Sequence, residues 1–145
     1  MKVSPTQLDR CTLNTTRRLT RAMSHLYDAA LSSVELKSTQ FSLLATLRYQ
    51  GELPLSQLAK ALLMERTTLT RNLKPLIARG LVESKTEQDK RIKIIALTQQ
   101  GDALLSKAEP LWKTAQMSVV DRFGRDRWEK LVIEMAALSD LTQNS

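Results

Sequence analysis

Apolar residues recur every three or four positions along most of the chain, which is the spacing of amphipathic helices. This spacing predicts helices over residues 8–34, 38–49, 54–63, 66–79 and 99–123, and a last helix after Gly124. Two strand-like runs, 81–86 and 91–98, flank the polar turn 87–90. The pattern therefore predicts a mainly α-helical protein with a small β-hairpin.

Capping residues set the predicted ends of several helices. Ser38 or Thr39 is expected to cap the second helix, and Thr98 the helix that follows the hairpin. Gly51 and Gly80 each stand where a left-handed residue commonly ends a helix. The boundaries thus rest on residues with a known preference for helix ends.

Two short helices joined by a tight turn, with a hairpin after them, make a winged helix-turn-helix. We expect residues 38–98 to form this lobe within a single domain of residues 1–145. The flanking long helices, in residues 1–37 and 99–145, carry more apolar surface than the lobe can cover. A second copy of the chain would bury it, so we expect these regions to form a homodimer.

The charge of the chain indicates a polyanionic partner. The formal net charge is +7, and residues 48–93 hold ten basic and five acidic residues, or +5 of that total. A basic winged lobe favours double-stranded DNA as the partner. Three interpretations remain open: a sequence-specific transcription regulator, an architectural protein that binds DNA without sequence preference, or a winged domain used only for protein contacts.

Several other classes of protein do not fit the sequence. There is no Gly-rich phosphate loop and no metal-ligand spacing, and one Cys with one His cannot build a zinc cage within a chain. We therefore expect no catalytic residues, no metal and no cofactor. Apolar runs of at most four residues and an N-terminus without a signal-peptide pattern predict a cytoplasmic protein outside the membrane.

The predicted helix 66–79 has one apolar face and one face suited to DNA. The latter carries hydroxyl, guanidinium and ammonium groups, from Arg66, Thr67, Thr70, Arg71 and Lys74. A helix of this kind fits a major groove about 12 Å wide. Ser56 and Gln57 lie in the first turn of the preceding helix, where they can meet a phosphate. The hairpin tip, residues 89–91, suits the minor groove.

The chain resembles the MarR family of bacterial transcription regulators over nearly its whole length. The matching segments are Gln40-Phe-Ser-Leu-Leu, Leu55-Ser-Gln-Leu-Ala, Arg66-Thr-Thr-Leu-Thr-Arg-Asn-Leu, Gly80-Leu-Val, and Asp89-Lys-Arg with Leu97-Thr98. The resemblance implies a homodimer on an inverted-repeat operator. It further implies a repressor that a small aromatic or phenolic ligand, or an oxidant, releases from DNA.

The same resemblance implies roles for individual residues. The expected groove and phosphate contacts are Thr67, Thr68, Thr70 and Arg71. Phosphates near them would be neutralised by Lys74, Lys90 and Lys93. Arg91 would enter the minor groove, with its guanidinium held by a bidentate pair to Asp89.

Cys11 and His25 are candidates for a redox or ligand role. Cys11 stands beside Arg10 near the start of a long predicted helix, a setting that activates thiols. Some family members sense peroxide with a thiol in their first helix, yet they tend to carry tyrosines where this chain has Ser38 and Thr39. Packing at a dimer interface is the alternative for Cys11. His25 would either border a ligand cavity or serve as a structural residue.

Overall fold

The computed structural model describes residues 2, 4–86 and 88–141 of the 145-residue chain. Its elements follow in the order α1 (Pro5–Asp9), α2 (Thr12–Leu31), the 3-10 helix η1 (Ser32–Val34), α3 (Ser38–Gln50), β1 (Leu53–Pro54), α4 (Leu55–Ala61), α5 (Arg66–Ala78), β2 (Val82–Thr86), β3 (Lys93–Leu97), α6 (Gln99–Phe123) and α7 (Arg125–Leu141). No helix within these residues is long and apolar enough to cross a membrane.

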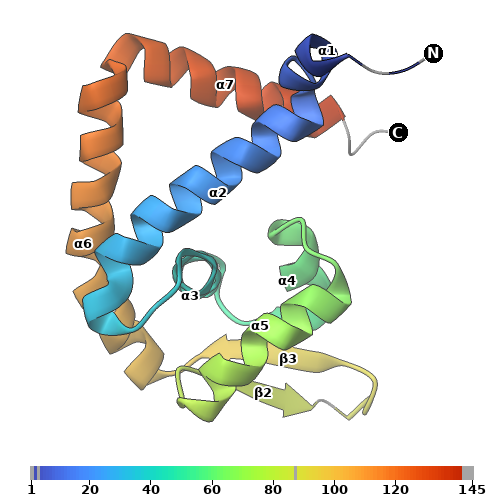
Figure 1. The fold of residues 1–145 in the computed structure, drawn as a ribbon. Coiled ribbons are helices and arrows are strands. Elements are labelled where there is room, and N and C mark those ends of the chain that lie inside the picture. The colour runs from blue at the N-terminus through green and yellow to red at the C-terminus, as the bar shows by residue number, and fades with distance from the viewer. Residues whose placement is uncertain (1, 3, 87, 142–145) are drawn as a thin grey trace.

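Helices α3, α4 and α5 pack with a small antiparallel sheet to form the winged lobe (Figure 1). The strand order is β1-β3-β2, so β3 is central. Ile95 of β3 is paired with Leu53 on one side and with Ser84 on the other. The predicted fold class, mainly α with a β-hairpin wing, is confirmed. β1 was not predicted, because a two-residue strand leaves no periodic signal.

The core of the lobe is built mainly from leucine. Fully buried leucines come from all three helices of the lobe, and the set includes Leu43, Leu44, Leu58, Leu69 and Leu76. Leu105 and Ala108 of α6 are also fully buried and belong to the same cluster. The lobe and the long helix α6 therefore share one core.

Outside the lobe, three long helices form an open frame. Figure 1 shows α6 running along one side, α2 crossing diagonally from it and α7 turning back above α2. α2 and α7 both contact α6, and α7 has no buried residue. The frame exposes many large apolar side chains, among them Leu13, Leu19, Met117, Leu131, Val132, Ile133, Met135, Leu138 and Leu141.

The expectation of one continuous helix at the N-terminus is wrong, because the chain breaks between α1 and α2. Cys11 is extended there and serves as the N-cap of α2. The side chains of Asn14 and Thr15 donate to the carbonyl oxygens of Leu8 and Asp9, at 3.4 and 3.3 Å. These bonds satisfy carbonyls that a continued helix would otherwise use, so the break costs little.

The predicted cap of α3, Ser38 or Thr39, is also wrong. The N-cap is Lys37, whose N–H donates to Oε1 of Gln40 at 2.9 Å. The N–H of Ser38 donates to Oδ1 of Asp28 at 2.6 Å. A carboxylate from α2 therefore caps α3 from outside, which the local sequence does not reveal.

The junction between the lobe and α6 is tight. Thr98 caps α6 as predicted: its Oγ1 accepts the N–H of Gly101 at 3.0 Å and donates to the carbonyl of Gly80 at 2.6 Å. Gly80 has φ +70°, the left-handed conformation predicted for it. A Cβ on Gly101 would lie 2.0 Å from the carbonyl oxygen of Leu81. Only glycine allows α6 to approach the lobe this closely.

Candidate nucleic-acid interface

Helices α4 and α5 form the helix-turn-helix. The turn between them contains Leu63, which is left-handed (φ +50°) and 61% exposed. Leu58 of α4 and Leu69, Leu73 and Leu76 of α5 are buried and hold the pair on the core. The packing fixes which face of α5 points outward.

The outward face of α5 carries the polar residues expected there. All six are exposed: Arg66, Thr67, Thr68, Thr70, Arg71 and Lys74. The Thr70 hydroxyl donates to the carbonyl of Arg66 at 2.9 Å. Ser56 and Gln57 are exposed in the first turn of α4. The structure thus leaves these side chains accessible from outside the lobe.

In the wing, Asp89 holds the backbone of the turn and not the side chain of Arg91. Its Oδ1 accepts the N–H of Arg91 at 3.1 Å, and its carbonyl accepts the N–H of Ile92 at 2.9 Å. Among the ion pairs of the described residues, none joins Asp89 to Arg91, so the expected bidentate pair is wrong. The cations Lys90, Arg91 and Lys93 are exposed. Position 87 of the predicted turn lies outside the described residues.

The cations of the lobe fall into two groups. Arg48 and Lys85 are ion-paired with carboxylates, and Arg79 donates to the carbonyl of Glu35 at 2.6 Å. Six cations on the outward face of α5 and around the hairpin tip form no ion pair with any described residue, and they are Arg66, Arg71, Lys74, Lys90, Arg91 and Lys93; Lys60 of α4 forms none either. Unneutralised positive charge therefore lies on α5 and the hairpin.

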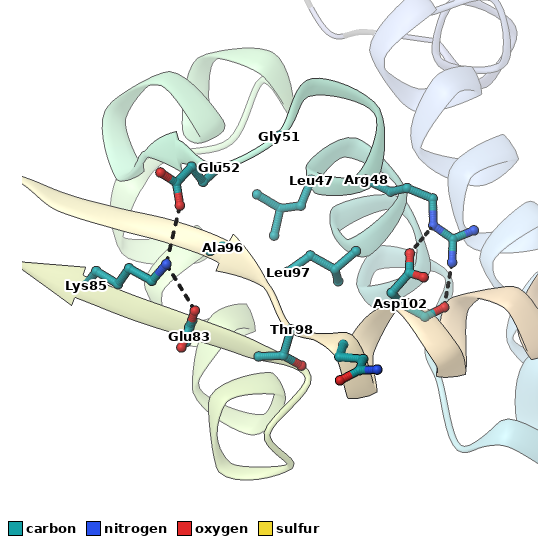
Figure 2. A pocket seen from close by; sticks show the side chains of 11 residues that line it. Leu47, Arg48, Gly51, Glu52, Glu83, Lys85, Ala96, Leu97, Thr98 and Asp102 are labelled. Carbon is teal, nitrogen blue, oxygen red and sulfur yellow. Dashed lines mark hydrogen bonds and ion pairs between the residues drawn. The ribbon is translucent and has the colours of Figure 1, made fainter.

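A cavity of about 480 Å³ lies between the end of α3, the sheet and the start of α6 (Figure 2). On one side, Nζ of Lys85 is 3.2 Å from Glu83 and 3.5 Å from Glu52, and the hydrogen bond and charge of Glu83, followed by those of Glu52, raise the pKa of Lys85. On the other side, Arg48 pairs with Asp102. The sequence assigns these pairs no role, because Asp102 and Glu52 are 54 and 33 residues from the cations that they contact.

A second, more apolar cavity of about 240 Å³ lies between α2, α6 and α7. Its lining includes Met23, Tyr27, Val119, Trp128 and Met135. The Tyr27 hydroxyl bonds to Oε1 of Gln116, and burial raises the pKa of Tyr27.

The two candidate redox or ligand residues lie apart. His25 is exposed and does not line the apolar cavity between α2, α6 and α7. Cys11 is a half-buried free thiol at the break between α1 and α2. The part of the chain that the structure describes holds no group of three or more His, Cys, Asp or Glu placed to bind a metal ion.

The helix-turn-helix, the wing and the unpaired cations together define a winged-helix protein with a surface suited to DNA. A family model described as the MarR family matches residues 36–93. The chain is 39% identical to the Mycobacterium tuberculosis transcriptional regulator MosR, solved in complex with DNA; the match covers 92% of this chain and 97% of MosR, with a TM-score of 0.85. The chain belongs to the MarR family and is a DNA-binding transcription regulator.

Two more distant structures share the fold. The transcriptional repressor CouR, bound to a 23-mer DNA duplex, is 23% identical, with a TM-score of 0.83 and coverage of 96% of this chain and 99% of CouR. BpsR of Bordetella bronchiseptica is 21% identical, with a TM-score of 0.82 and coverage of 97% and 99%. The matched proteins are transcription regulators, not enzymes.

Proposed function

We propose that this protein is a repressor that binds an inverted-repeat operator as a homodimer and leaves it when a small molecule or an oxidant acts. The observation that carries the proposal is the division of the lobe's cations. Arg48 and Lys85 are neutralised by carboxylates, whereas the cations of α5 and of the hairpin tip, residues 90–93, have no ion-pair partner among the described residues. Such cations are the groups that replace the counterions of DNA phosphates.

The contacts divide between the two DNA grooves and the backbone. α5 enters the major groove, and its contacts come from Arg66, Thr67, Thr68, Thr70 and Arg71. Arg91 enters the minor groove, while Asp89 holds the turn that presents it. The remaining contacts are to phosphates and come from Ser56, Gln57, Lys74, Lys90 and Lys93. Hydroxyls and guanidinium groups at base edges give the sequence preference.

The dimer is supported by the exposed apolar residues of α2, α6 and α7. In this proposal residues 38–98 are the DNA-binding lobe, and residues 1–37 and 99–145 form the dimerisation region. Ile133 and Leu141 of α7 are 67% and 69% exposed in the single chain, and such a row of apolar side chains is normally covered by a partner. Two identical lobes related by a two-fold axis match two half-sites of an inverted repeat.

The proposed release from DNA by a small molecule is supported by the apolar cavity between α2, α6 and α7. An aromatic or phenolic effector would find apolar walls there and two polar groups, Tyr27 and Gln116. The DNA binding of BpsR is regulated by 6-hydroxynicotinic acid, a small aromatic compound. Oxidation of Cys11 is the second route, because this thiol lies at a helix break that a larger sulfur group would disturb.

Equilibrium binding of wild type and Arg71→Ala tests the sequence preference. The DNA duplexes are a site selected from a random library and an unselected duplex of equal length. The control is Lys113→Ala, which removes an exposed cation of α6 that has no ion-pair partner among the described residues.

We expect wild type to prefer the selected site. Arg71→Ala should reduce its affinity about 5- to 150-fold, with a smaller loss on unselected DNA. The control variant should bind as wild type does. Equal wild-type affinity for both duplexes would contradict the proposal and indicate an architectural DNA-binding protein.

A further inference from the structure

Arg48 joins the winged lobe to the long helix α6. It lies in the last turn of α3, and its Nε donates to Oδ1 of Asp102 at 2.7 Å (Figure 2). Its Nη1 donates to Oε1 of Glu109 at 2.8 Å, and its Nη2 donates to the Asp102 carbonyl at 2.5 Å and to Oγ of Ser106 at 2.9 Å. One guanidinium therefore contacts three residues along two turns of α6.

The two helices that Arg48 connects lead to different parts of the molecule. α3 belongs to the lobe that carries α5 and the wing, whereas α6 continues beyond the lobe to contact α2 and α7. Other links cross the same junction. At the start of α6, Thr98 donates to the carbonyl of Gly80 and Gln100 to the carbonyl of Arg79, and further along the ring of Phe41 stacks on Trp112 with 5.7 Å between centroids. Arg48 supplies a charged link between the first turn of α6 and Trp112.

These links differ in how strongly they fix an angle. Apolar contacts have little directionality and allow small rotations, whereas the bonds of Thr98 and Gln100 are directional but lie only at the start of α6. A planar guanidinium that donates through three nitrogens to acceptors on successive turns has one favourable orientation. The Arg48 side chain is 27% exposed, whereas those of Asp102 and Glu109 are 55% and 42% exposed, so its role rests on the geometry of the contacts and not on unscreened charge.

We propose that Arg48 is a positioning residue that fixes the tilt of the winged lobe on α6, and thereby the distance between the two recognition helices of the dimer. This inference rests on the homodimer and inverted-repeat operator proposed above. Arg48 does not contact DNA in this scheme. It acts by limiting the set of lobe orientations, so that one spacing between half-sites is favoured.

A small tilt is enough to matter. The 13 residues of α5 span about 20 Å at 1.5 Å per residue. Rotating a body of that length by about 10° moves its far end by roughly 3.5 Å, which is close to one base-pair step. Loss of the Arg48 contacts would therefore reduce the difference in affinity between operators whose half-site spacing differs by a single base pair.

Lys85 provides a matched control. Like Arg48, it lines the cavity of Figure 2 and contacts two carboxylates. Its partners Glu52 and Glu83 both lie within the lobe, so it makes no link to α6. Lys85→Gln removes the same charge as Arg48→Gln, and it leaves the junction intact.

The test uses the full-length protein and a selected inverted repeat, together with versions whose half-sites are moved by one or two base pairs. Affinities are measured for wild type, Arg48→Gln, Arg48→Lys and Lys85→Gln, after circular dichroism and gel filtration have checked folding and oligomeric state. Arg48→Lys keeps the positive charge but cannot reproduce the several hydrogen bonds of the planar guanidinium. If Arg48→Gln does not fold, Arg48→Lys alone tests the inference.

For wild type and Lys85→Gln we expect a clear preference for one spacing. For both Arg48 variants that preference should fall by about fivefold or more. A merely structural role would lower the affinity for all spacings by a common factor, and that result, or an unchanged preference, would overturn the inference. If wild type itself shows no spacing preference, the proposed inverted-repeat operator fails first.

Discussion

Gly101→Ala adds a single methyl group where the first turn of α6 lies against the lobe. The new Cβ would be 2.0 Å from the carbonyl oxygen of Leu81, 2.9 Å from its carbonyl carbon and 2.8 Å from Cδ1 of Leu97. Carbon atoms in favourable contact stay about 3.5–4.0 Å apart, so α6 or the Leu81 backbone must move by more than about 1 Å.

The movement has a cost that the surrounding bonds allow us to gauge. The Leu81 carbonyl also accepts the N–H of Thr98 at 3.1 Å, so the displacement disturbs the cap of α6. Overpacking costs about 1–3 kcal/mol and a lost cap about 1 kcal/mol, while alanine's helix propensity returns at most about 1 kcal/mol. We expect a net loss of about 1–3 kcal/mol, or a Tm lower by about 2–12 °C.

Thermal and urea unfolding followed by circular dichroism, at one fixed protein concentration, measure this loss. Gly51→Ala is the control, because Gly51 has φ +82° and a Cβ there would meet nothing within 4 Å. Because its ψ is −169°, a conformation nearly restricted to glycine, Gly51→Ala should lose about 1–3 kcal/mol from backbone strain alone. A Gly101→Ala protein as stable as wild type would refute the steric reasoning.

Four further outcomes follow from the structure. Partial burial raises the pKa of Asp28, but the hydrogen bond from Ser38 and the charge of Lys37 outweigh it and lower the pKa overall. Asp28→Asn should therefore be less stable than wild type in urea unfolding at pH 7. The difference in stability should shrink as the pH falls below about 4. Leu63→Gly relieves a left-handed leucine that is largely exposed and should raise the unfolding free energy by about 0.5–1 kcal/mol; a lower Tm would contradict this. Arg91→Ala should weaken binding most on operators with an A·T-rich minor groove, and equal losses on G·C-rich variants would count against the wing contact. Cys11→Ser should keep DNA binding in gel-shift assays while abolishing any response to peroxide, and a surviving response would exclude this thiol.

Much of the fold could be predicted because its helices carry strong local signals. α6 begins after Thr98 and ends before Gly124, as its cap and its breaker predict. The break at Cys11 could not be predicted, since it depends on Asn14 and Thr15 bonding back to α1. The capping of α3 by Asp28 depends in the same way on a contact that forms only in the folded chain.

The candidate site likewise has features that the local sequence predicts and features that depend on the folded chain. Periodicity separates the outward face of α5 from its leucines, and the structure leaves the outward residues exposed. Which cations are neutralised is a non-local property. The partners of Arg48 are 54 and 61 residues away, and one partner of Lys85 is 33 residues away. Charge counting alone treated Arg48, Lys85 and Arg91 as equivalent.

The most direct test of the central claim is retention of fragmented genomic DNA by the purified protein at near-physiological salt with excess competitor, followed by sequencing. We expect strong enrichment of one inverted repeat, and we expect the enrichment to be lost with Arg71→Ala. Uniform retention of all fragments would contradict a sequence-specific regulator, and enrichment of a single half-site without its inverted copy would contradict the dimer.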